Sequence, residues 1–206
     1  MCIDPFGVPG PQMAARGMRF AYPPITDVTA DLVLITHEHF DHNAAERVGG
    51  TPQVIRSTAG TLETQLGRVT AVASEHDPVA GTQRGPNTIF AFTLDGLRVC
   101  HFGDFGQREL RAEQAEALGR VDLLMIPVGG GPTAGADLAA QIVERLQPRL
   151  VVPMHYRTPA ISFLEPADAF LAKFAHVHRC EQPEFDTAAL PSSGGAPLIV
   201  VPAVPV

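Results

Sequence analysis

Residues 31–42 read Asp-Leu-Val-Leu-Ile-Thr-His-Glu-His-Phe-Asp-His. The first six residues are a largely apolar run that predicts a buried β-strand. Residues two apart in an extended chain point to the same side, so His37 and His39 can face one cation. Asp41 and His42 begin the turn that follows and can reach a second cation. Imidazole and carboxylate are ligands of zinc, manganese and iron, so this HxHxDH pattern predicts most of a metal site.

The competing interpretation of this stretch is a polar loop or helix N-terminus that is rich in histidine. Packing gives little reason to place three histidines and an aspartate at the mouth of an apolar strand. The pattern therefore favours metal binding.

Three further candidate ligands follow other predicted strands. His76 comes after the run 68–73, and Asp104 and His155 come after two later runs. Polar side chains at strand ends can converge on one rim of a sheet, so these three can complete the site. Each also has a sequence context typical of an ordinary turn, so none predicts a ligand when taken alone.

The rest of the chain alternates short β-type runs with helical patterns. Further strands are predicted at 52–56, 68–73, 88–94, 97–102, 121–128 and 150–153, and helices at 109–118, 137–146 and 165–174. Asp95-Gly96 is typical of a two-residue hairpin turn. The uncharged segment 190–206 is expected to be a loop followed by one short strand. Hairpins mixed with crossover helices predict two packed sheets with helices outside.

Composition narrows the function classes. The chain has 206 residues, 45% of them hydrophobic, which fits one domain over residues 1–206. Its formal net charge is -7 and it has no basic cluster, so long nucleic acid is not the expected partner. No apolar stretch reaches the ~20 uninterrupted residues of a membrane helix, and the N-terminus does not resemble a secretory signal. Three cysteines without CxxC spacing favour a reducing compartment, and we expect a cytoplasmic location.

These motifs resemble the metallo-β-lactamase superfamily, and within it the small metal-dependent hydrolases similar to L-ascorbate-6-phosphate lactonase. The resemblance runs from Ile3-Asp4-Pro5 to His155-Tyr156 and includes residues 84–88, Gly103-Asp104 and residues 126–130. It implies an α/β (α+β) fold, a four-layer αββα sandwich with a dinuclear site along one sheet edge. Relatives usually begin about two strands earlier, so we expect the first N-terminal strands of the sandwich to be lacking. An open sheet edge would then favour a homo-oligomer.

The resemblance also implies roles for the candidate ligands. It assigns His37, His39 and His76 to the first metal ion, and Asp41, His42 and His155 to the second. Asp104 would bridge the two ions, and Asp4 would support the HxHxDH loop without binding metal. The expected cofactors are two divalent ions, zinc with manganese or iron as alternatives.

This site predicts a hydrolase that cleaves a small ester, lactone or phosphoester. A water that bridges two such ions loses a proton near neutral pH and becomes the nucleophile. Asp41 and His155 are the expected catalytic residues, and Asp41 or a metal-bound water would protonate the leaving group. Two alternatives stay open: a phosphodiesterase or nuclease of the same fold, and an N-terminally truncated member that binds metal without turnover.

Other polar residues receive weaker assignments. His101 is expected in the core or behind the ligands, and His176 and His178 on the exposed face of a late strand. Asp77 would orient a ligand or face solvent. Substrate contact and a structural role are both open for Tyr156 and Arg84.

Overall fold

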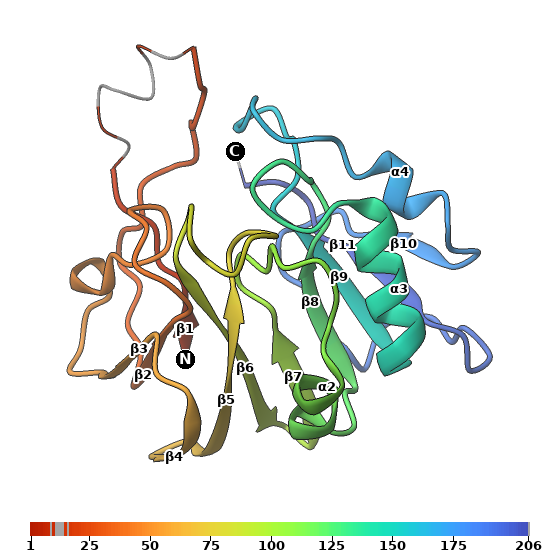
Figure 1. Cartoon of the computed structure of the whole chain (residues 1–206), viewed down its shortest axis with the longest axis horizontal. Coiled ribbons are helices and arrows are strands. Elements are labelled where there is room, and N and C mark those ends of the chain that lie inside the picture. Colours follow the sequence, from red (N-terminus) through yellow and green to blue (C-terminus); the bar gives the residue numbers. More distant parts are fainter. Residues whose placement is uncertain (9, 11–14, 16, 206) are drawn as a thin grey trace.

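The computed structural model describes residues 1–8, 10, 15 and 17–205, which form two stacked β-sheets (Figure 1). The small sheet holds, all in parallel, β1 (Cys2–Ile3), β2 (Leu32–Ile35) and β3 (Gln53–Arg56). The large sheet holds, in spatial order, β10 (Val177–Arg179), β11 (Leu198–Val201), β9 (Leu150–Met154), β8 (Leu123–Pro127), β7 (Leu97–His101), β6 (Pro86–Leu94), β5 (Gly67–Glu75) and β4 (Gly60–Thr64). It is antiparallel from β4 to β7 and parallel from β7 to β10.

β2 shows why the sheets stack. All four of its side chains are fully buried, and they alternate between two cores. Leu32 and Leu34 lie in the core shared with the large sheet. Val33 and Ile35 point the other way and pack under the short 3-10 helix η1 (Ala45–Arg47). The apolar run therefore contributes buried side chains to both faces of the small sheet.

Helices cover the outer face of the large sheet (Figure 1). They are α2 (Ala112–Leu118), α3 (Ala136–Leu146) and α4 (Asp168–Leu171). In α3, Ala139, Ile142 and Val143 are buried on one stripe that faces the sheet. The layers run η1, small sheet, large sheet and helices, which confirms the expected αββα class.

Most predicted elements are present with shifted ends. The Asp95-Gly96 turn joins β6 to β7 with both residues at positive φ, as a two-residue hairpin requires. The predicted helix 165–174 is wrong at both ends, since α4 spans only four residues. Pro166 disfavours helical backbone at the residue before it, so the helix cannot begin at Glu165.

The topology places four strand ends on one rim. β5, β7, β8 and β9 all run in the same direction, because β5 and β7 each pair antiparallel with β6. Their carboxyl ends therefore meet at one edge of the large sheet, beside the end of β2. No helix in the described ranges has the length and apolar character to cross a bilayer.

Candidate metal centre

Asp104 lies at the centre of a cluster of histidines. Its Oδ2 is 3.1 Å from Nε2 of His76, 3.4 Å from Nε2 of His155 and 3.8 Å from Nε2 of His37. Its Oδ1 is 3.5 Å from Nε2 of His42. These side chains follow the carboxyl ends of β2, β5, β7 and β9. The structure therefore agrees with the prediction that polar residues at these strand ends converge.

Candidate ligand atoms that lie within 4.8 Å of one another form three overlapping groups. The first histidine group is His37, His39 and His76, the second is His42, Asp104 and His155, and Asp4, His37 and His42 form the third. Asp41 lies beside the second group, with Oδ2 3.8 Å from Nε2 of His42. All seven predicted ligands therefore lie in one region, and their division between two ions stays a prediction.

Asp4 orients two of these imidazoles through hydrogen bonds. Its carboxylate accepts hydrogen bonds from the backbone N–H and the hydroxyl of Thr36, at 2.8 and 2.7 Å. Because the Thr36 hydroxyl donates to Asp4, its oxygen accepts from Nδ1 of His37 at 3.0 Å. Nδ1 of His42 donates to Asp4 Oδ2 at 3.1 Å. His37 thus keeps Nε2 unprotonated, and both rings aim Nε2 at the cluster.

His76 and His155 are oriented in the same way by the loop after β8. Nδ1 of His76 donates to the carbonyl oxygen of Pro132 at 3.1 Å. The Thr133 hydroxyl donates to the Gly130 carbonyl, so its oxygen accepts from Nδ1 of His155 at 3.3 Å. Four imidazoles therefore direct Nε2 toward one centre.

Asn87 holds the Asp104 turn, a role that the sequence did not reveal. Its Oδ1 accepts the backbone N–H of Asp104 at 3.0 Å, and its Nδ2 donates to the Phe102 carbonyl at 2.8 Å. The expected group behind the ligands is His101, whose Nδ1 accepts the Gly103 N–H at 3.1 Å. Asn87 is a buried polar residue near the start of β6, just before the apolar run 89–92.

The environment of the cluster favours a neutral imidazole at His37 and a positively charged one at His42. Burial lowers the pKa of His37 to about 3, helped by the positive field of His42. Burial also opposes a charge on His42, yet the carboxylates of Asp104 and Asp4 outweigh it and raise the pKa of His42 to about 10. Burial would raise the pKa of Asp104, but the imidazoles, His42 foremost, hold it well below its usual range.

The residues present fit a divalent metal. Within the part of the chain that the structure describes, Nε2 of His37 and Oδ1 of Asp104 are buried without a hydrogen-bond partner. A buried polar atom without a partner is costly, and both atoms are metal-ligand types. A cation held between the histidines and the carboxylate would satisfy both of them.

The remaining predicted residues lie outside this centre. Asp77 is buried and accepts backbone N–H bonds from residues 79, 81, 83 and 84, so it anchors the loop after His76 and does not face solvent. These bonds lower its pKa against the opposing effect of desolvation. His176 is exposed and His178 is half-buried. Tyr156 lines a cavity next to the cluster, whereas Arg84 is exposed away from it.

A known family shares this fold and site. The family model described as "Beta-lactamase superfamily domain" matches residues 1–155. The chain belongs to the metallo-β-lactamase superfamily. This superfamily member is 32% identical over 182 residues to a UPF0173 metal-dependent hydrolase of Thermococcus onnurineus, with 76% of each chain covered. A UPF0173 metal-dependent hydrolase of Pyrococcus horikoshii is 32% identical over 192 residues, covering 78% of this chain and 79% of its own.

A solved structure supports the same family. A candidate Zn-dependent hydrolase of the metallo-β-lactamase superfamily from Thermotoga maritima matches with a TM-score of 0.72 and 29% identity, over 89% of this chain and 88% of its own. The fold and the enzyme class predicted from the sequence are therefore confirmed. This superfamily member is a metal-dependent hydrolase.

Proposed function

We propose that this hydrolase cleaves a small ester, lactone or phosphoester at a centre of two divalent ions, with zinc as the native metal. The position of Asp104 carries this proposal, because its two carboxylate oxygens lie between the two histidine groups. A carboxylate in that position can share its oxygens between two ions. The Zn-dependence in the name of the Thermotoga maritima protein supports zinc.

Each of the two ions would have its own set of ligands. His37, His39 and His76 would hold the first ion, His42, His155 and Asp41 the second, and Asp104 would contact both. Two such ions would supply a water of lowered pKa as the nucleophile and would polarise the carbonyl or phosphoryl oxygen of the substrate.

Asp41 would carry the proton of the reaction. Its side chain lines the cavity beside the cluster and is 21% exposed, more than the buried Asp104. A carboxyl group that touches both the cluster and the cavity can pass a proton to the leaving group. Asp4 could not do so, since its oxygens accept bonds from Thr36 and His42.

Removal and return of metal test the proposal. Protein stripped with a chelator should lose hydrolysis of phenyl acetate and diphenyl phosphate, and zinc should restore whichever activity the native protein has. His39→Ala and Asp104→Ala should each lower kcat by at least about a hundredfold, because they remove groups that hold the reacting centre.

His176→Ala is the matched control, since His176 is an exposed histidine remote from the cluster. Its activity should equal that of the native chain. Unchanged rates in Asp104→Ala would refute the assigned site. Metal binding with no hydrolysis of either substrate class would favour the non-catalytic alternative.

A further inference from the structure

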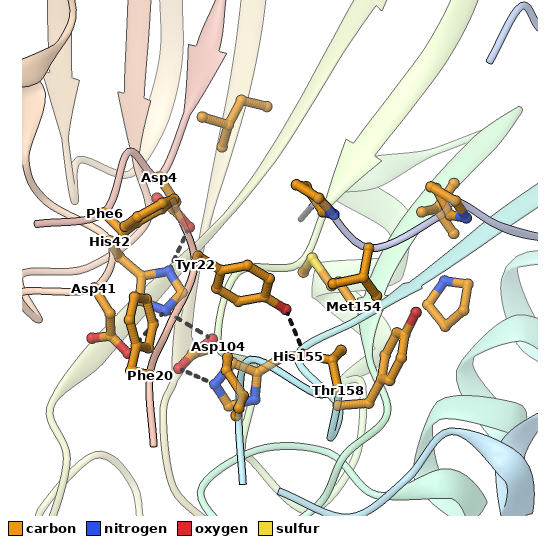
Figure 2. A pocket seen from close by; sticks show the side chains of 18 of the residues that line it. Asp4, Phe6, Phe20, Tyr22, Asp41, His42, Asp104, Met154, His155 and Thr158 are labelled. Atoms are coloured by element: carbon orange, nitrogen blue, oxygen red, sulfur yellow. Dashed lines mark hydrogen bonds and ion pairs between the residues drawn. The ribbon is translucent and has the colours of Figure 1, made fainter. Parts of the chain in front are cut away.

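A cavity of about 430 Å³ opens directly beside the second histidine group. Asp41, His42, Asp104 and His155 lie together at one side of it (Figure 2), and the segments that follow β1, β9 and β11 line much of the rest. This volume is at the small end of the range of ligand sites, so it fits a small molecule. A substrate that reaches the cluster through it must place part of itself against the other walls.

The other walls are apolar and come from three distant segments of the chain. The N-terminal segment contributes Phe6, Phe20 and Tyr22, whose rings contact one another at centroid distances of 5.5 to 6.2 Å. The loop after β9 contributes Ile161 and Phe163, and the segment after β11 contributes prolines.

Hydrogen bonds fasten these walls together. The Ala21 N–H donates to the Ala160 carbonyl at 2.9 Å, and the hydroxyls of Tyr22 and Thr158 lie 3.1 Å apart (Figure 2). The N-terminal segment is thus bound to the loop after β9 across the cavity. Contacts between distant segments of the chain therefore hold the cavity walls in place.

The charged groups of the lining all belong to the cluster end of the cavity. Asp4, Asp41, Asp104 and His42 lie there, and none of the described lining residues is Lys or Arg. An anionic group buried against the aromatic walls would lose its hydration without gaining a partner. An uncharged, apolar group would not meet this cost.

We infer that the substrate is an uncharged carboxylic ester or lactone whose apolar group fills this cavity. The inference rests on the proposed function and narrows its substrate class. In the reaction, the acyl carbon–oxygen bond breaks and water supplies OH to the acyl carbon and H to the alcohol oxygen. A lactone gives one hydroxy acid, and an ester gives an acid and an alcohol.

Kinetics of the metal-loaded protein test the inference first. From phenyl acetate through phenyl butyrate to phenyl hexanoate, kcat/KM should rise at least about tenfold, because each added methylene leaves water for an apolar wall. Diphenyl phosphate should be at least about tenfold slower than phenyl hexanoate. A faster phosphodiester, or no dependence on chain length, would overturn the inference while leaving the hydrolase proposal intact.

Ligand binding gives a second measurement that needs no turnover. Tyr22 and Tyr156 are the only tyrosines of a chain without tryptophan, and both line the cavity. Tyrosine fluorescence therefore reports on this cavity. Cyclohexyl methyl ketone should change it in a saturable way and bind at least about tenfold more tightly than cyclohexyl phosphate. Equal or reversed affinities would overturn the inference even if no ester were hydrolysed.

A charged substitution in the wall provides the matched pair of variants. Phe163→Arg should remove the dependence of kcat/KM on acyl chain length and strengthen the binding of cyclohexyl phosphate. Leu94→Arg, at an exposed site on the far end of β6, should behave as the native chain does. A Phe163→Arg protein that melts with the native chain yet keeps the chain-length dependence would contradict the assignment of this wall.

Discussion

Thr36 connects two parts of the metal centre through one hydroxyl group. The group donates to Asp4 at 2.7 Å and accepts from His37 at 3.0 Å, and the residue is fully buried. Partners behind metal-binding histidines fix the ring orientation and the position of the proton. The hydroxyl therefore controls which nitrogen of His37 faces the cluster.

Thr36→Val removes this hydroxyl while keeping the shape of the side chain. We expect zinc affinity to fall by about 10- to 100-fold, with little change in the far-ultraviolet circular dichroism spectrum. Competition with a chromogenic chelator measures the affinity. Thr61→Val, on the exposed face of the edge strand β4, is the control and should bind zinc as the native chain does. Equal zinc affinity in both variants would show that the hydrogen bonds from Asp4 through Thr36 to His37 do not affect metal binding.

Gly106 allows the backbone beside His76 to approach closely. A Cβ built at this position would lie 2.6 Å from the carbonyl carbon and oxygen of His76. The Gly106 N–H also donates to the Glu75 carbonyl at 2.9 Å, so the two segments are held in contact. Any side chain at position 106 must displace either the loop that contains it or the backbone of His76.

Gly106→Ala should therefore destabilise the fold by about 1–3 kcal/mol and weaken zinc binding, because the added methyl overlaps backbone. Thermal unfolding and a zinc titration measure the two effects. Gly135→Ala is the control, since its Cβ would meet nothing closer than 3.7 Å. If the two variants have the same melting temperature and affinity, the close approach does not constrain the site.

The start of β8 is tied to its neighbours through Asp122. Oδ2 of Asp122 accepts the backbone N–H of Arg98 at 2.9 Å, and Arg120 contacts Oδ1 at 2.6 Å. The hydrogen bond from Arg98 lowers the pKa of Asp122 against partial desolvation. A carboxyl whose native pKa is lowered adds stability above the unfolded pKa of about 3.9, and that stability is lost as the pH falls through the native pKa.

Asp122→Asn should thus lower the melting temperature at pH 7, and the difference from the native chain should shrink below about pH 4. We expect about 1 kcal/mol or less, because solvent screens this carboxylate. Melting curves across pH measure the difference. A difference that grows toward acid pH would contradict the assigned sign.

Local sequence signals predicted those strands and turns whose structure depends on near neighbours. The apolar run before His37 forms β2, and Asp95-Gly96 forms its hairpin turn. β4 was missed because an exposed edge strand needs no apolar alternation. The helix expected over 165–174 failed because its periodic pattern carried more weight than the restriction imposed by Pro166.

The residues of the cluster could be predicted because the HxHxDH pattern at the end of an apolar strand has few structural explanations, and the family resemblance indicated the others. The groups that orient them could not, since Thr36 and Asn87 contact their partners only after distant strands have paired. The cavity was also beyond the sequence, because its walls come from three segments that meet only in the folded chain. Long-range packing decides these features, and local patterns do not encode it.

The molecule as a whole is organised around Asp104, where the ends of both sheets meet. A zinc titration of the metal-stripped chain by calorimetry tests that arrangement most directly. We predict saturation at about two ions per native chain and a lower stoichiometry in Asp104→Ala. Saturation at one ion or none in the native chain, or two ions in Asp104→Ala with unchanged affinity, would contradict a dinuclear centre that shares this carboxylate.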